Sequence, residues 1–97
     1  MLNIIWSDDA VDDVLENIDY LEKHWTKKEV DTFSEEIDAV LDKLSVGNLT
    51  FKPCGYKNTY EVPIIKQITL YYQVQDNDIL LVRFWNNYRN PDNLVIK

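Results

Sequence analysis

Apolar residues change their spacing along the chain, and each change marks the start of a new element. Residues 2–6 are a short run of mostly apolar residues, including two isoleucines and a tryptophan, which predicts a strand. Ser7 follows as a helix N-cap, with Asp8 and Asp9 in the first turn, where the helix dipole favours negative charge. From there to about His24, apolar residues recur at helical spacing between acids, which predicts an amphipathic helix.

A second helix begins after a very short connection. Thr26 and Glu29 have the spacing of a capping box, and Gly47 supplies a C-terminal stop. Between them, apolar residues again recur every three or four positions. Because the linker Trp25-Thr26 is too short for a crossover, we expect the two helices to pack antiparallel as an αα-hairpin.

The second half of the chain changes to the alternating pattern of strands. After a predicted loop over residues 48–58, three runs have strand composition: 60–65, 67–75 and 79–85. Residues 76–78 form a tight turn, and Pro63 favours an edge position for the first strand. We therefore predict a single α+β domain over residues 1–97, with an N-terminal strand, an antiparallel αα-hairpin and a three-stranded antiparallel meander forming one sheet.

The charged residues are also distributed unevenly between the predicted helices and the rest of the chain. The formal net charge is −7, but residues 8–44 carry 13 acids and 4 lysines, a balance of −9. The remaining residues carry 4 acids and 6 bases, a balance of +2. An acidic segment repels phosphate groups, so only the C-terminal half could approach a nucleic acid closely.

The composition also indicates the compartment. No stretch approaches the roughly 18 apolar residues of a membrane helix, and the first residues lack the pattern of an export signal. The single Cys54 cannot form an internal disulfide, which agrees with a reducing compartment. We therefore expect a cytoplasmic protein without membrane contact, and we expect no metal and no cofactor.

Sorting the predicted strands with a period of two leaves apolar residues on both faces of the sheet. The helical hairpin can cover only one face. The other face and its edge would carry Tyr71, Leu81, Arg83, Trp85 and Arg89. This mixture of aromatic, aliphatic and arginine side chains is typical of a binding surface, so we expect a partner chain there. The alternative is that the tail folds back and covers this face with Leu94, Val95 and Ile96.

Three segments carry a resemblance to a known family. Residues 5–10, Ile5-Trp6-Ser7-Asp8-Asp9-Ala10, match an opening pattern of strand, serine and alanine-bearing helix. A helix ends on Trp25, and residues 84–91 read Phe-Trp-Asn-Asn-Tyr-Arg-Asn-Pro. With the paired strands between them, these features resemble the RelE/ParE superfamily, the toxins of bacterial type II toxin–antitoxin modules. The last segment is similar to a subgroup common among Bacteroidetes-type members.

The resemblance implies a small toxin neutralised by a cognate antitoxin, which fills the uncovered grooves of the toxin. In such pairs the antitoxin usually carries the DNA-binding part, so DNA contact would come only through it. RelE-like members cleave mRNA on the ribosome without a metal, with basic side chains and a C-terminal Tyr, Arg or His. ParE-like members instead bind DNA gyrase and block it.

The RNA-cleaving pattern is only partly matched. Thr69 stands where RelE-like enzymes place an arginine in the long strand, and Asn87 stands near their C-terminal catalytic arginine. Arg83, Tyr88 and Arg89 lie close by in sequence and would be the catalytic set of an RNA-cleaving toxin. The leading hypothesis is therefore a ParE-like toxin that binds a protein target such as DNA gyrase. A ribosome-dependent mRNA endonuclease is the first alternative, and a non-toxic module that retains antitoxin binding is the second.

Overall fold

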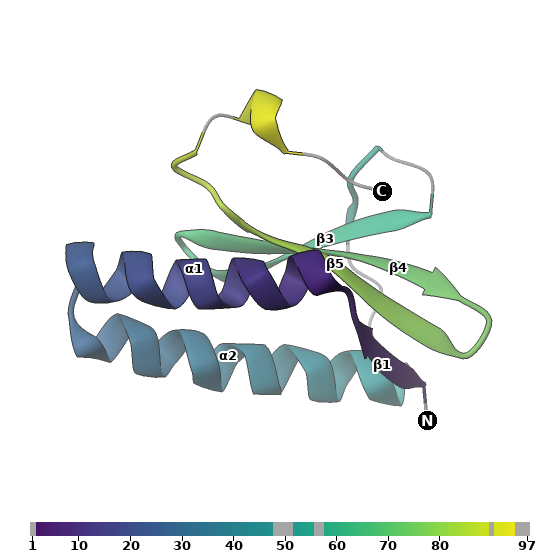
Figure 1. Ribbon diagram of the computed structural model, residues 1–97. Helices are drawn as coiled ribbons and strands as arrows, with labels where there is room; N and C mark the ends of the chain where they lie inside the picture. The colour runs from purple at the N-terminus through teal and green to yellow at the C-terminus, as the bar shows by residue number, and fades with distance from the viewer. Residues whose placement is uncertain (1, 48–51, 56–57, 90, 95–97) are drawn as a thin grey trace.

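The computed structural model describes residues 2–47, 52–55, 58–89 and 91–94, which form a two-layered α+β fold. In chain order the elements are β1 (Asn3–Trp6), α1 (Asp8–His24), α2 (Lys27–Val46), β2 (Lys52–Pro53), β3 (Thr59–Ile65), β4 (Ile68–Gln75), β5 (Asp78–Asn86) and the 3-10 turn η1 (Pro91–Asn93). The two helices lie side by side against one face of the sheet, and η1 lies on the opposite side (Figure 1).

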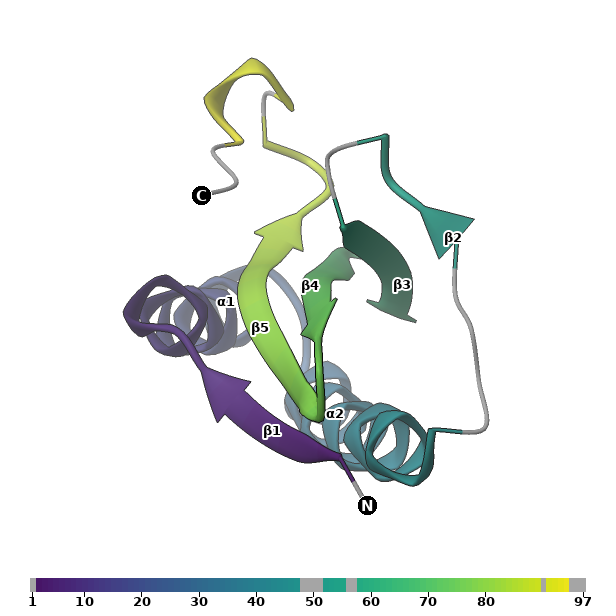
Figure 2. The same ribbon diagram turned by 90° about the vertical axis from the view of Figure 1, so that its right-hand side faces the viewer.

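The sheet has five strands in the order β1-β5-β4-β3-β2. Strands β3, β4 and β5 form the predicted antiparallel meander, so the α+β fold with its helical hairpin is confirmed. The sheet is nevertheless mixed, because β1 pairs with β5 in parallel at one edge. The predicted loop over 48–58 also contains the two-residue strand β2, which pairs with β3 at the other edge (Figure 2).

The helix boundaries follow the caps that the sequence predicts. The Ser7 hydroxyl accepts a hydrogen bond from the Ala10 N–H at 3.0 Å, and the Glu29 carboxylate accepts one from the Thr26 N–H at 3.0 Å. A hydrogen bond from the Thr26 side chain also lowers the pKa of Glu29. Gly47 ends α2 in the left-handed region with φ of 80°, which glycine adopts without steric cost. Neither described helix is long and apolar enough to cross a membrane.

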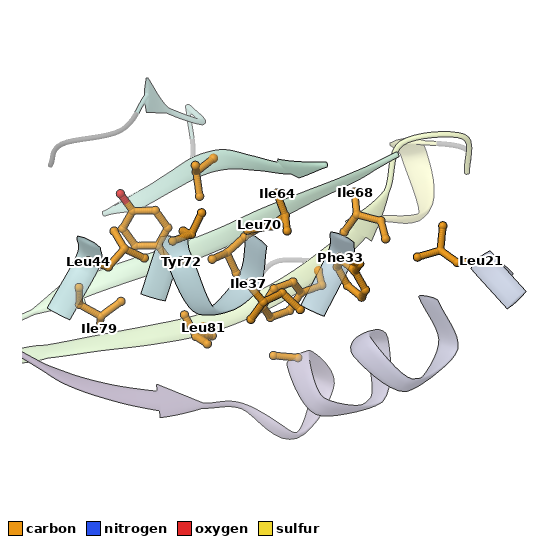
Figure 3. Packing of buried hydrophobic residues seen from close by; sticks show 14 residues of the cluster. Leu21, Phe33, Ile37, Leu44, Ile64, Ile68, Leu70, Tyr72, Ile79 and Leu81 are labelled. Carbon is orange, nitrogen blue, oxygen red and sulfur yellow. The ribbon is translucent and has the colours of Figure 1, made fainter. Parts of the chain in front are cut away.

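The core fills the space between the hairpin and the sheet (Figure 3). Helix α2 contributes a stripe of four buried residues, Phe33, Ile37, Val40 and Leu44. The sheet contributes Val62, Ile64, Ile68, Leu70, Tyr72, Ile79, Leu81 and Phe84. Phe33 meets Phe84 edge to face with ring centroids 6.5 Å apart, a geometry that aromatic pairs favour.

Helix α1 completes the edge of β5 at the point where β1 ends. The parallel pairing stops at Trp6, opposite Leu81. The Ser7 N–H donates to the Leu81 carbonyl at 3.1 Å, and the Ser7 hydroxyl donates to the Val82 carbonyl at 3.1 Å. The residue that caps α1 therefore also continues the pairing of the sheet edge.

Two buried polar residues of α1 satisfy the next backbone groups of β5. The Asp13 carboxylate accepts a hydrogen bond from the Phe84 N–H at 3.0 Å, and the Asn17 amide donates to the Phe84 carbonyl at 2.8 Å. The same carboxylate binds the guanidinium of Arg83 through two hydrogen bonds of 2.6 and 3.0 Å. Asp13 thus holds one backbone donor and one charged side chain of the strand at once.

Replacing Asp13 with alanine should lower the free energy of unfolding by about 3 kcal/mol, because the change leaves Arg83 and the Phe84 N–H without this acceptor. The matched control is Asp12→Ala, which removes the same charge from an exposed position of the same helix. This control should change stability by no more than about 0.5 kcal/mol. Urea denaturation of the two variants measures the difference, and equal midpoints would contradict the role given to Asp13.

Candidate functional site

A β-bulge decides which side chains of β5 point away from the helices. The register of β4 against β5 shifts between Tyr71, opposite Arg83, and Tyr72, opposite Leu81, so Val82 is an extra residue in β5. Before the bulge, Leu81 faces the core and is fully buried, whereas after it Phe84 takes the core side. The prediction that Leu81 shares the uncovered face with Arg83 and Trp85 is therefore wrong. The prediction assumed that side chains alternate strictly along β5, and the bulge at Val82 interrupts this alternation.

We use the term outer face for the side of the sheet that points away from the helical hairpin. Two cross-strand rows run over it, since paired residues in neighbouring strands point to the same side. One row joins Glu61, Tyr71 and Arg83, and the other joins Pro63, Thr69 and Trp85. Tyr71, Arg83 and Trp85 are thus brought together as the sequence predicts.

Trp85 is covered rather than open on this face. Only 4% of its surface is exposed, although the sequence predicts an accessible binding residue. The guanidinium carbons of Arg83 and Arg89 lie over its ring, 5.5 and 4.9 Å from the centroid. Such cation–π contacts are favourable, and the two arginine side chains help to cover the Trp85 ring. In the alternative arrangement three tail residues would cover this face; Leu94 is half-buried, and Val95 and Ile96 lie outside the described residues.

Both arginines are tied to carboxylates of α1. Arg83 forms its close pair with Asp13, and the hydrogen bond to this carboxylate raises the pKa of the guanidinium, although burial alone would lower it. Arg89 lies 3.7 Å from Glu16, with both side chains more than half exposed. The Arg83 pair is therefore a fixed structural contact, whereas the Arg89 pair is a weak one that a partner can displace.

The two positions at which the resemblance expects catalytic arginines lie next to each other. The Thr69 hydroxyl donates to the Asn87 side-chain oxygen at 2.9 Å, and the Asn87 amide donates to the Lys66 carbonyl at 3.1 Å. The hydrogen bonds at these two positions therefore join neutral groups, a hydroxyl and an amide. A hydroxyl and an amide can bind a phosphate or a base edge, but they neither supply positive charge nor act as a base.

Tyr71 stands in a short network of ionisable groups. Its pKa is raised, chiefly because the phenol is desolvated and also because the Glu61 carboxylate is close by. Glu61 in turn lies 3.6 Å from the Lys52 ammonium. The phenol therefore holds its proton more tightly, and a hydrogen bond with the Glu61 side chain engages its single O–H donor.

The exposed residues of the predicted set are at the end of β5. Tyr88 is 55% exposed, and its backbone N–H donates to the Asn86 side chain at 2.9 Å. Arg89 follows it directly, so both side chains can reach a partner. Among the described residues, no three His, Cys, Asp or Glu side chains come together in a way that could hold a metal ion.

Sequence reasoning missed the carboxylates that hold the arginines. Asp13 and Asn17 occupy the buried stripe of α1 together with Ala10 and Leu21. Polar residues at such positions indicate that a buried partner satisfies them, and this signal is visible in the spacing alone. Glu16 gives no such signal, because it is exposed and its partner Arg89 is remote in the sequence.

A family model described as the ParE toxin of the type II toxin–antitoxin system parDE matches residues 4–91. The chain belongs to the ParE toxin family. The RelE/ParE resemblance is thereby confirmed, and this protein is a toxin of a type II toxin–antitoxin system. No curated protein sequence matches the chain.

Solved structures support the same fold for this ParE-family toxin. It is similar to a chain of the chromosomal ParDE system of P. aeruginosa, with a TM-score of 0.72, 12% identity, and coverage of 89% of this chain and 96% of that one. It is also similar to the YoeB dimer of Staphylococcus aureus, with a TM-score of 0.61, 20% identity, and coverage of 90% and 98%. A chain of the YoeB-YefM complex of the same organism gives a TM-score of 0.60, 20% identity, and coverage of 91% and 99%. At these identities the likeness concerns the fold.

The raised pKa of Tyr71 gives a prediction for titration. Because the folded chain holds the phenolic proton more tightly, its contribution to stability is present below the ordinary pKa of about 10 and is lost as the pH rises through the folded-state value. NMR of the tyrosine ring carbons should show Tyr71 ionising at higher pH in the folded chain than a tyrosine in a short unstructured peptide. Glu61→Gln should lower the Tyr71 pKa only partly, because desolvation remains the larger cause. A full return to the ordinary value would contradict this order of causes.

Proposed function

We propose that this toxin acts by binding a protein target, such as DNA gyrase, and not by cleaving RNA. The observation that carries the proposal is the hydrogen bond between Thr69 and Asn87, which fills the two expected arginine positions with neutral groups. Phosphoryl chemistry without a metal needs positive charge at the phosphate as the negative charge develops. This pair does not supply it.

The charges of the outer face support the same proposal. Lys52, Arg83 and Arg89 lie against Glu61, Asp13 and Glu16 respectively. A cation that already has a carboxylate partner gains less from a phosphate and releases fewer counterions when RNA binds. With a net charge of −7, the whole chain also repels a polyanion. A protein surface is therefore the partner that these charges favour.

We further propose that a cognate antitoxin neutralises this toxin. The related YoeB forms a solved toxin–antitoxin complex with YefM, and this chain shares its fold. Arg89 and Tyr88 are the exposed residues beside the outer face, and Arg89 is held only by a weak pair. A partner that supplies its own carboxylate can exchange with Glu16 at little cost.

The purified toxin in excess over DNA gyrase should inhibit supercoiling of a relaxed plasmid. The double variant Tyr88→Ala with Arg89→Ala should weaken inhibition by about tenfold or more, since exposed tyrosine and arginine side chains often dominate interfaces. Lys43→Ala, an exposed cation on α2, is the matched control and should inhibit as the wild type does. Full supercoiling activity at saturating toxin would contradict gyrase as the target.

One observation favours RNA cleavage as a second candidate. Two guanidinium groups, of Arg83 and Arg89, gather over the single ring of Trp85, next to the exposed Tyr88. The side chains of Arg83, Arg89 and Tyr88 would be the catalytic set of an RNA-cleaving toxin. Incubation of the toxin with translating ribosomes, followed by primer extension on the mRNA, separates the two candidates. Transcripts should stay intact, and cleavage that is lost in the Tyr88 and Arg89 variants would establish the second candidate instead.

A further inference from the structure

Helix α1 exposes a stripe of apolar residues on the side that faces away from the sheet. Val11 is 43% exposed and Leu15 is 63% exposed, the largest value among the exposed large apolar side chains of the described residues. Ile18 continues the stripe and is half-buried against the core. The spacing of four and three residues places these side chains on one line along the helix.

The stripe leads into a hollow near the turn of the hairpin. The hollow has a volume of about 360 Å³ and is lined by Glu22, Lys27, Val30 and Asp31. Glu22 follows Ile18 by four residues, so the hollow lies on the line of the stripe. Val30, from α2, is the apolar residue of the lining and packs partly against the core. The stripe and the hollow together span about three turns of α1.

The charges around this surface limit what can occupy it. Residues 8–44, which include both helices, carry a balance of −9. A second copy of the same acidic surface would be repelled, as would a nucleic acid or an anionic membrane. A helix with an apolar side and lysines or arginines beside it has the complementary pattern.

We infer that the stripe of Val11, Leu15 and Ile18, with the hollow at Glu22 and Val30, is a docking site for a cationic amphipathic helix of a partner protein. The apolar residues of that helix would cover the stripe and place one side chain in the hollow. Its basic residues would meet the acids of α1 and α2. The inference does not depend on the target of the toxin, because the stripe lies on a different surface from the outer face.

The test uses the full chain and two synthetic peptides of identical composition, each about four helical turns long. In one peptide, leucines recur at i, i+3, i+4 and i+7 among lysines; in the other, the same residues are scrambled around the helix. Isothermal titration calorimetry gives the affinity, and amide NMR shifts give the location. The patterned peptide should bind at least tenfold more tightly and should shift the amides of residues 11–22 and Val30.

Variants of the toxin separate apolar contact from general charge. Leu15→Gln with Val11→Gln should weaken the patterned peptide about tenfold, whereas Val46→Gln, an equally exposed apolar position elsewhere, should not. Reversing Glu22 and Asp31 to lysine should weaken binding more than the same reversal at Glu35 and Asp42. Circular dichroism shows that each variant is folded.

Three results would overturn the inference. Equal binding of both peptides would mean that charge alone attracts them. Shifts confined to the outer face would place the site elsewhere. A concentration-dependent dimer in sedimentation that Leu15→Gln abolishes would show that a second copy of this chain occupies the stripe. None of these results would change the outcome of the supercoiling assay. The docking inference and the proposed gyrase target can therefore be rejected independently.

Discussion

The incomplete pairing of β5 is the constraint on which the rest of the structure depends. Strand β1 covers only the first half of β5, from Asp78 to Leu81, so the following backbone groups would lie buried without partners. An unpaired buried N–H or carbonyl costs about 1–3 kcal/mol, and several occur in succession here. Side chains of α1 and its N-cap take their place, with Ser7, Asp13 and Asn17 each bonded to the strand. These bonds set both the position and the rotation of α1 against the sheet, and the apolar core then fills the space beneath.

The bonds between α1 and β5 also fix the side chains of the outer face. The Asp13 oxygen that accepts from the Phe84 N–H also accepts from the Arg83 guanidinium. Arg83 is thereby fixed, and its guanidinium lies over Trp85 together with that of Arg89. An arginine with a closely bound carboxylate is a poor centre for stabilising phosphate charge, but it makes a rigid, well-defined element of a protein-binding surface. The requirement to complete a sheet edge thus supports the proposal that this site binds a protein.

The spacing of apolar residues predicted the features that depend on residues close in the sequence. It did not predict the features that depend on how the strands pair. The capping signals at Ser7 and Glu29, the helical stripes and the meander are local features, and each is present. The bulge at Val82 is not local, because an extra residue in β5 appears only when the register against β4 is known. One inserted residue reverses the side of every later residue, so Arg83 and Trp85 lie on the opposite face from Leu81 although strict alternation places all three together. The parallel pairing of β1 was likewise hidden, since it joins residues more than 70 positions apart.

The rotation of α1 also explains how one helix can present two independent surfaces. At 3.6 residues per turn, Asp13 and Leu15 lie about 200° apart around the axis, so the side that holds β5 is nearly opposite the exposed stripe. Substitution of Leu15 should therefore leave the contacts of Asp13 to Arg83 and Phe84 intact. Because a buried network and an exposed apolar line share one rigid helix without sharing side chains, a partner on either surface can bind without requiring the other surface to change.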